Sequence, residues 1–136
     1  MVTAKDFAAE LPVAPIHQRL GIQVLEATEE RVVGTLPVTG NEQPFGALHG
    51  GASVVLAESL GSIGSVIHAG SAAQVVGIEV SASHHRAATA GMVTGVATPV
   101  HLGRTLATWA VTMTDDEGRT TCTARITCMI RPTASQ

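Results

Sequence analysis

The sequence predicts an α+β domain in which an antiparallel sheet wraps around one long helix. An apolar segment from Gly51 or Ala52 to His68 predicts a single helix that is apolar nearly all round, as full burial requires. Two strand-like runs precede this helix and four follow it. The composition is rich in aliphatic residues, with two Phe, one Trp and no Tyr. Such side chains suit a helix buried against a sheet.

The segment before the helix predicts a lead-in, a hairpin and a loop. Residues 1–20 are expected to be helical or irregular, because Pro12 and Pro15 interrupt them. Two partly alternating, β-branched runs follow, and a short turn would join them as a hairpin. The expected strand bounds are 22–27 and 31–38. Residues 39–51 are expected to form a loop, because they contain Pro44 and four glycines.

The segment after the helix predicts four strands. Gly70 is expected to end the helix, and an acidic turn at 115–118 would join the last two strands. Cys122 and Cys128 lie on the last strand, too far apart along it to bond to each other, and are expected to be reduced thiols in or near the core. No repeat or linker interrupts the chain, so residues 1–136 are expected to form one domain. The expected strands are 73–82, 92–100, 106–114 and 120–131.

The charge pattern argues against nucleic-acid and membrane partners. The formal net charge is -3, the pI is near 6.0, and the eight Lys and Arg are scattered. No basic run is available to bind nucleic-acid phosphates or an anionic membrane surface. The N-terminus shows no basic leader followed by an apolar run, so we expect no signal peptide and a cytoplasmic location. Glu58 and His68 within the apolar stretch favour a buried helix over a membrane span.

Glu58 is the most informative residue of the sequence. It is the only Asp, Glu, Lys or Arg between Gln43 and Ile78, and it lies in the middle of the apolar helix. Exposure is disfavoured, because the helical neighbours Val54 and Val55 are apolar. Buried carboxylates are costly and cluster at functional sites, although hydrogen-bonded structural carboxylates also occur. Position alone leaves both interpretations open.

The start of the helix is the second candidate feature. His49-Gly50-Gly51 precedes the apolar run, and the first N–H groups of a helix have no internal partner. They can hold a developing oxyanion, although Gly-Gly by itself fits a flexible turn better. Gly50 and Glu58 would lie ~12 Å apart along one helix, whereas a reacting group must come within roughly 3–3.5 Å of its target. If both act on one carbonyl, they come from two antiparallel chains, and the protein is at least a dimer.

Two basic clusters lie at strand junctions, His84-His85-Arg86 and His101-Leu-Gly-Arg104. Arginine can bind phosphate through its planar fork of donors, but spacing alone favours solvated turn residues. We expect no metal site, because the six His show no ligand spacing and the adjacent His84 and His85 would point to opposite faces of a strand.

One stretch resembles the signature of hotdog-fold acyl-CoA thioesterases: Gln43-Pro-Phe-Gly-Ala-Leu-His-Gly-Gly-Ala-Ser-Val-Val-Leu-Ala-Glu58-Ser-Leu-Gly-Ser62. The branch is that of the Arthrobacter-type 4-hydroxybenzoyl-CoA thioesterases. The likeness is closer still to the 1,4-dihydroxy-2-naphthoyl-CoA hydrolases of menaquinone biosynthesis and to the proofreading thioesterases of the enterobactin pathway. The two basic clusters and Cys122-Thr-Ala-Arg125 extend it towards the C-terminus, so that it covers residues 18–131.

The resemblance implies a hotdog fold, with a long central helix wrapped by a five- to six-stranded antiparallel sheet. It implies a homodimer that pairs into a homotetramer, with active sites between chains. The implied reaction is hydrolysis of an acyl-CoA, aromatic or medium-chain, to a free acid and coenzyme A. No cofactor is implied, because coenzyme A is part of the substrate.

The resemblance also assigns roles to individual residues. Glu58 matches the catalytic carboxylate, as nucleophile or general base, and Gly50 matches the N–H that polarises the thioester carbonyl. The supporting residues are Gln43 and His49 near the carbonyl, Ser62 near the carboxylate or its water, and His84, Arg86 and Arg104 for coenzyme A. Two alternatives stay open: an enoyl-CoA hydratase of the same fold, although the loop before the helix has no Asp, and a non-catalytic acyl-CoA-binding module, against which Glu58 counts.

Overall fold

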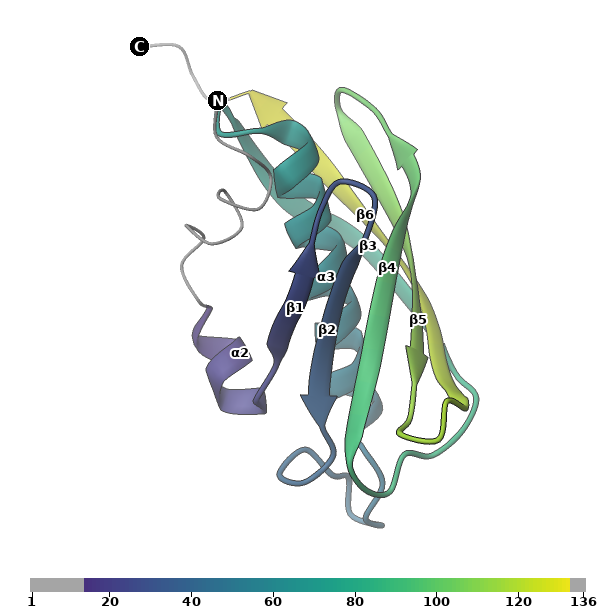
Figure 1. The fold of residues 1–136 in the computed structure, drawn as a ribbon. Coiled ribbons are helices and arrows are strands. Elements are labelled where there is room, and N and C mark those ends of the chain that lie inside the picture. Colours follow the sequence, from purple (N-terminus) through teal and green to yellow (C-terminus); the bar gives the residue numbers. More distant parts are fainter. Residues whose placement is uncertain (1–13, 133–136) are drawn as a thin grey trace.

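The computed structural model describes residues 14–132, which form two helices and six strands (Figure 1). Most of the expected lead-in, residues 1–13, lies outside the described residues, and its last part forms the short helix α2. The elements are α2 (Pro15–Leu20), β1 (Gln23–Ala27), β2 (Val32–Pro37), α3 (Gly50–Ala69), β3 (Ala73–His84), β4 (Met92–Leu102), β5 (Leu106–Thr114) and β6 (Thr120–Pro132).

The strands of the described chain form one six-stranded antiparallel sheet in the order β1-β2-β4-β5-β6-β3. The sheet curves around α3, which lies along its inner face (Figure 1). β1 and β3 are the two edges of the sheet. This arrangement confirms the expected α+β class and the hotdog architecture, a long helix wrapped by an antiparallel sheet.

Missing side chains in the sheet allow the middle of α3 to pack closely. Leu56 and Leu60 of the helix are fully buried. A Cβ atom built at Gly34 on β2 would lie 2.8 Å from Leu60 Cδ2, and one built at Gly95 on β4 would lie 2.9 Å from Leu60 Cδ1. Each strand therefore offers a gap into which a leucine side chain fits.

In the second half of α3 the glycines lie on the helix, and the large side chains lie on the sheet. A Cβ atom at Gly61 would overlap Ile126, and one at Gly64 would overlap the Trp109 ring. Trp109 and Ile126 are both buried on the inner face of the sheet. The glycines thus let the helix backbone approach β5 and β6.

The predicted bounds of the long helix are confirmed to within two residues. Gly70 ends it with a φ of 80°, a backbone conformation that glycine adopts without strain, and donates its N–H to the Val66 carbonyl at 3.0 Å. By length and hydropathy, α3 is the one helix of the described chain that could cross a membrane. Eight of its residues are buried in the fold, as in the core helix of a sheet-wrapped domain.

The strands confirm all six sequence predictions, with differences at some ends. β5 has the expected bounds, whereas β3 and β4 each continue two residues further, to His84 and Leu102. His84 pairs with Cys122 on β6, and Leu102 pairs with Ala107 on β5. The neighbouring strand therefore sets these ends, and local sequence does not reveal it.

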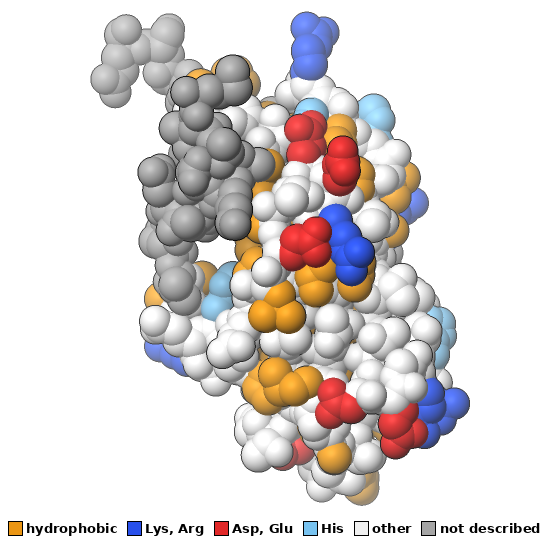
Figure 2. Space-filling model, in the orientation of Figure 1, with side chains coloured by type: hydrophobic (Ala, Val, Ile, Leu, Met, Phe, Trp, Pro, Cys, Tyr) orange, Lys and Arg blue, Asp and Glu red, His pale blue; other side chains and the backbone are white. Residues whose placement is uncertain are grey.

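Both cysteines are free and buried, as expected. Burial raises the pKa of the Cys122 thiol, which keeps it protonated and unreactive. Basic side chains are scattered over the face seen in Figure 2 and do not gather into a patch. Arg31 forms an exposed ion pair with Glu26 at 3.6 Å, and the exposed Arg119 pairs at 2.9 Å with Asp115, whose side chain is largely covered.

Candidate active site

The N-terminus of α3 presents one backbone N–H that has no acceptor among the described residues, that of Gly50. His49 caps the helix, and its Nδ1 accepts the Gly51 N–H at 2.8 Å. The His49 carbonyl accepts the N–H groups of Ala52 and Ser53. The Gly50 N–H therefore stays available at the positive end of the helix dipole, where it can polarise a carbonyl oxygen.

His49 was expected near the carbonyl, and the structure shows in addition that its ring caps α3. An Nδ1 that accepts a hydrogen bond is unprotonated, so the neutral ring carries its proton on Nε2. By occupying the Gly51 N–H, this ring leaves the Gly50 N–H as the donor nearest the loop. The structure thus shows His49 as the cap of α3, and its expected role near the carbonyl stays a prediction.

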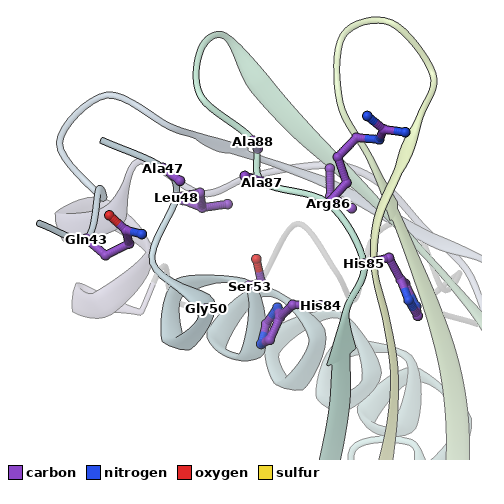
Figure 3. A pocket seen from close by; sticks show the side chains of 11 residues that line it. Gln43, Ala47, Leu48, Gly50, Ser53, His84, His85, Arg86, Ala87 and Ala88 are labelled. Carbon is purple, nitrogen blue, oxygen red and sulfur yellow. The ribbon is translucent and has the colours of Figure 1, made fainter. Parts of the chain in front are cut away.

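A cavity of about 370 Å³ opens beside Gly50 (Figure 3). Its walls come from the loop before α3, the first turn of α3, the end of β3 and the loop that follows. The structure therefore brings three predicted site residues, Gln43, His84 and Arg86, to the same cavity as Gly50. The lining residues are Gln43, Ala47, Leu48, Gly50, Ser53, His84, His85, Arg86, Ala87, Ala88 and Thr121.

The loop that carries Gln43 is closed by its own hydrogen bonds. The Gln43 N–H donates to the Ala47 carbonyl at 2.8 Å, and its side-chain Oε1 accepts the Phe45 N–H. The bond from the Phe45 N–H fixes the orientation of the amide group, so its nitrogen, which is a donor, points the other way. Figure 3 shows this nitrogen on the cavity side. This orientation suits a hydrogen bond to a substrate oxygen.

His84 and His85 point to opposite sides of the strand, as predicted (Figure 3). The His84 ring lies against Gly50, because a Cβ atom built at Gly50 would lie 2.9 Å from His84 Nε2. His85 turns away and forms a 2.8 Å hydrogen bond with Thr123 Oγ1. Arg86 is exposed at the cavity edge, where its side chain extends outward.

Glu58 lies away from this cavity and is exposed in the single chain. The expectation that exposure is disfavoured is therefore wrong for one chain. The sheet covers only one side of α3, and Glu58 lies near the side that it leaves open, with Val54 and Val55 half-buried. Its Oε1 atom lies over Gly77 on β3, 2.9 Å from where a Cβ atom would stand.

Ser62 lies one turn beyond Glu58, and its Oγ is 3.8 Å from Cys128 Sγ. Gly77 and Cys128 are paired across β3 and β6, so Glu58 and Ser62 contact the same residue pair of the sheet. The two side chains thus lie over the same part of the sheet, and the role expected for Ser62 stays a prediction.

Arg104 lies at the other end of the molecule, in the turn between β4 and β5 (Figure 1). The adjacent Gly103 carbonyl contacts His68 Nε2 at 2.7 Å, near the C-terminus of α3. One chain therefore does not bring Arg104 to His84 and Arg86. Among the described residues, no three His, Cys, Asp or Glu side chains are grouped as metal ligands.

Two residues near the site were not found from the sequence, Gly77 and His17. His17 Nε2 bonds Ser59 Oγ at 2.8 Å, which ties α2 to the turn of α3 that carries Glu58, and burial lowers the pKa of His17. Both contacts join residues far apart in sequence. No local spacing could have revealed them.

Comparison with known proteins relates this chain to one class of enzyme. The model of the Thioesterase superfamily matches residues 45–122. A protein named proofreading thioesterase EntH, from Cronobacter turicensis, is 43% identical over 119 residues, which are 87% of this chain and 87% of that protein. The solved structure of a thioesterase variant from Pseudomonas aeruginosa has a TM-score of 0.83 and 43% identity, covering 86% of each chain.

Two further solved structures are variants of one Staphylococcus aureus protein, which is called a thioesterase in the first of them. A Gln-to-Ala variant is 30% identical, with a TM-score of 0.84 and coverage of 88% of this chain and 100% of that one. A Glu-to-Ala variant is 31% identical, with a TM-score of 0.83 and coverage of 86% and 98%. The two substituted residues lie fifteen positions apart in that protein, and so do Gln43 and Glu58 in this chain.

Proposed function

Because this chain belongs to the thioesterase superfamily and is a thioester hydrolase like its named relatives, we propose that it hydrolyses acyl-coenzyme A to a free acid and coenzyme A. The observation that carries the proposal is the unpaired Gly50 N–H beside the cavity that Gln43 and His84 also line. A thioester carbonyl placed there would accept the Gly50 N–H and the Gln43 amide. Both donors stabilise negative charge as it develops on the oxygen.

Glu58 supplies the carboxylate of the proposed reaction. In one route its oxygen attacks the carbonyl carbon, the C–S bond breaks, and the coenzyme A thiolate leaves and takes up a proton. Water then hydrolyses the mixed anhydride and regenerates Glu58. In the other route Glu58 removes a proton from water, and the resulting hydroxide attacks the carbonyl directly. The C–S bond then breaks, and the coenzyme A thiolate leaves and takes up the proton held by Glu58. Both routes use the same pair of groups, Gly50 and Glu58.

The proposed site is shared between two chains. Gly50 and Glu58 are the first and ninth residues of α3, so ~12 Å of helix separates them. Glu58 is exposed on the side of α3 next to β3, and β3 is a sheet edge on which Val76 and Ile78 are each 51% exposed. A long edge with exposed apolar side chains favours pairing with another strand. A second, antiparallel copy would cover this edge and bring its Glu58 towards Gly50.

Coenzyme A would enter along the cavity edge, where the exposed Arg86 can bind its phosphates. His84, expected from the sequence to bind coenzyme A, lies against Gly50 and so near the thioester end. Arg104 could take part only from the partner chain. The half-buried apolar side chains of α3 would contact the acyl group, and we infer an aromatic or medium-chain acyl group. We further infer that two dimers pair into a tetramer, as the family resemblance implies.

Release of free thiol from a panel of acyl-CoAs tests the proposed reaction. Aromatic and medium-chain substrates are expected to react fastest, and the light-scattering mass is expected to be that of a tetramer. Hydrolysis of acyl groups on carrier protein, without hydrolysis of any acyl-CoA, would contradict the coenzyme A assignment.

Co-expression of two inactive variants tests the shared site. Gly50→Pro removes the N–H at the first helical position, where proline is tolerated, and Glu58→Ala removes the carboxylate. Random pairing gives half heterodimers, each with one intact site, so about a quarter of parental activity should return. Gly50→Ala is the matched control, because it adds a side chain beside His84 but keeps the N–H. Confirmed heterodimers without activity would overturn the shared site.

A further inference from the structure

Strand β3 is regular except at one position beside Glu58. Its register against β6 shifts between Gly77, which pairs with Cys128, and Glu79, which pairs with Thr127. Ile78 is therefore the extra residue of a β-bulge on an edge strand. Bulges of this kind often lie next to active sites, where they direct a neighbouring side chain.

The end of the Glu58 side chain occupies the space that a side chain at position 77 would need. A Cβ atom built at Gly77 would lie 2.9 Å from Glu58 Oε1 and 3.6 Å from its carboxyl carbon. The next atom in contact would be Ile126 Cδ1, at the ordinary distance of 3.5 Å. Glu58 is therefore the only close neighbour that excludes a side chain here, among the described residues.

The backbone does not require glycine at position 77. Six glycines of the described chain have a positive φ, and Gly77 is not one of them. Packing of the core does not require it either, unlike Gly61 and Gly64, whose positions are closed by the buried side chains of Ile126 and Trp109. The contact with the carboxylate remains as the reason for a missing side chain.

We propose that Gly77 is a positioning residue for the reaction, because its missing side chain lets the Glu58 carboxylate rest on β3 in the orientation that reaches the thioester. The inference rests on the proposed role of Glu58. A side chain at position 77 would push the carboxylate aside, and a displacement of about 1 Å can cost on the order of a hundredfold in rate. The displaced atoms end a flexible side chain, so the fold accommodates the change.

Gly77→Ala tests the proposal by separating kcat from KM and from stability. We expect kcat to fall by at least about tenfold, because the carboxylate is displaced. KM for an acyl-CoA should stay within about twofold, since Arg86, the proposed phosphate contact, lies nine residues further along the chain than Gly77. The melting temperature and the elution volume on size exclusion should match those of the parent. An unchanged kcat, a loss of folding or a loss of the oligomer would each overturn the proposal.

The double variant Gly77→Ala with Glu58→Asp supplies the second measurement. Aspartate is one methylene shorter, so its carboxylate withdraws from the added methyl group. Glu58→Asp should therefore cost several-fold less in kcat in the Gly77→Ala background than in the parent. If Glu58→Asp lowers kcat by the same factor in both backgrounds, Gly77 does not act through Glu58. Full activity of Glu58→Gln would instead refute the proposed function, so the two failures are distinguishable.

Discussion

The two ends of α3 use glycine for opposite purposes. At the N-terminus, Gly50 leaves room for the His84 ring and keeps its N–H free beside a cavity. In the second half, Gly61 and Gly64 let β5 and β6 close onto the helix, and no space remains. A missing side chain therefore borders a cavity at one end and lets the core close at the other. Only the surrounding contacts distinguish the two cases.

The polar groups at the two ends of α3 also differ, because one has a free hydrogen-bond donor and the other has its donors occupied. The Gly50 N–H lies at the positive end of the helix dipole and has no acceptor in the described chain. At the C-terminus, His68 contacts Glu29 Oε1 at 2.9 Å and the Gly103 carbonyl at 2.7 Å. Both partners are acceptors, so a doubly protonated ring satisfies both contacts. The first end faces a cavity, and the second is closed by contacts with other parts of the protein.

Glu58→Gln should have the largest effect, and it should affect activity alone. We expect kcat to fall by at least about a hundredfold, because the amide can neither attack nor accept a proton. Because Glu58 is exposed, the free energy of unfolding should change by less than about 0.5 kcal/mol. Thiol-release kinetics and thermal melting measure the two quantities. Activity within tenfold of the parent would exclude Glu58 as the catalytic group.

Gly64→Ala should give the opposite pattern, lost stability with normal activity in the folded fraction. The added methyl group overlaps the Trp109 ring, and such overpacking costs about 1–3 kcal/mol. This cost exceeds the gain in helix propensity of up to about 1 kcal/mol. Denaturant unfolding measures the difference.

A compensating variant checks the cause of that loss. Trp109→Phe removes the ring atoms that would overlap, together with an Nε1–H that has no partner among the described residues. Adding this substitution to Gly64→Ala should restore part of the stability. If Gly64→Ala is as stable as the parent, close packing is not the reason for glycine at position 64, and the contrast with Gly50 fails.

Arg86→Ala should raise KM about tenfold and leave kcat nearly unchanged, because a phosphate contact contributes equally in the ground and transition states. Thioesters of pantetheine, which lack the nucleotide, should show no change. Arg31→Ala is the matched control, since it removes an exposed arginine that is paired only with Glu26. An equal loss with the truncated substrate would argue against a phosphate contact.

The smallest effect should be a pH dependence of stability that comes from His68. Burial disfavours the charged ring, but the hydrogen bonds to Glu29 and Gly103 and the charge of Glu29 together raise the pKa of His68. Its contribution is therefore fully present below the unfolded pKa of about 6.5, and is lost as pH rises through the higher folded pKa. We expect less than about 1 kcal/mol, because Glu29 is exposed.

Melting temperatures of His68→Gln and the parent would measure this contribution between about pH 5.5 and about pH 8.5, which is from about one unit below to about two units above the ordinary pKa of histidine. The difference between the two proteins should shrink as pH rises. His17→Gln is the control with the opposite sign. Burial lowers the pKa of His17, so what that residue contributes is lost as pH falls. A constant difference across the range would exclude a charged His68.

Local sequence predicted the elements well because their signals are local. The apolar run and Gly70 defined α3, and the acidic residues at 115–118 marked a turn that Asp115 closes with its own side chain. The loop before α3 was recognisable by its Pro and Gly residues. Each of these features depends on neighbours a few positions away.

The relations between elements were not predictable in this way. Whether Glu58 is exposed depends on how far the sheet extends around α3, and the contact of Glu58 with Gly77 depends on a bulge set by pairing with β6. The separation of Arg104 from Arg86 follows from the length of β4, which lies between them. These facts arise from strand pairing, which no short window of sequence contains.

The bulge in β3 also affects the tendency of the newly made chain to aggregate. A newly synthesised subunit exposes a twelve-residue edge with Val76 and Ile78, and such edges recruit other unpaired strands into aggregates. A bulge and a charged residue, here Glu79, are two of the devices that make an edge unsuitable for an arbitrary strand. The irregularity beside Glu58 would thus hinder pairing with unrelated strands until the proposed partner chain covers this edge.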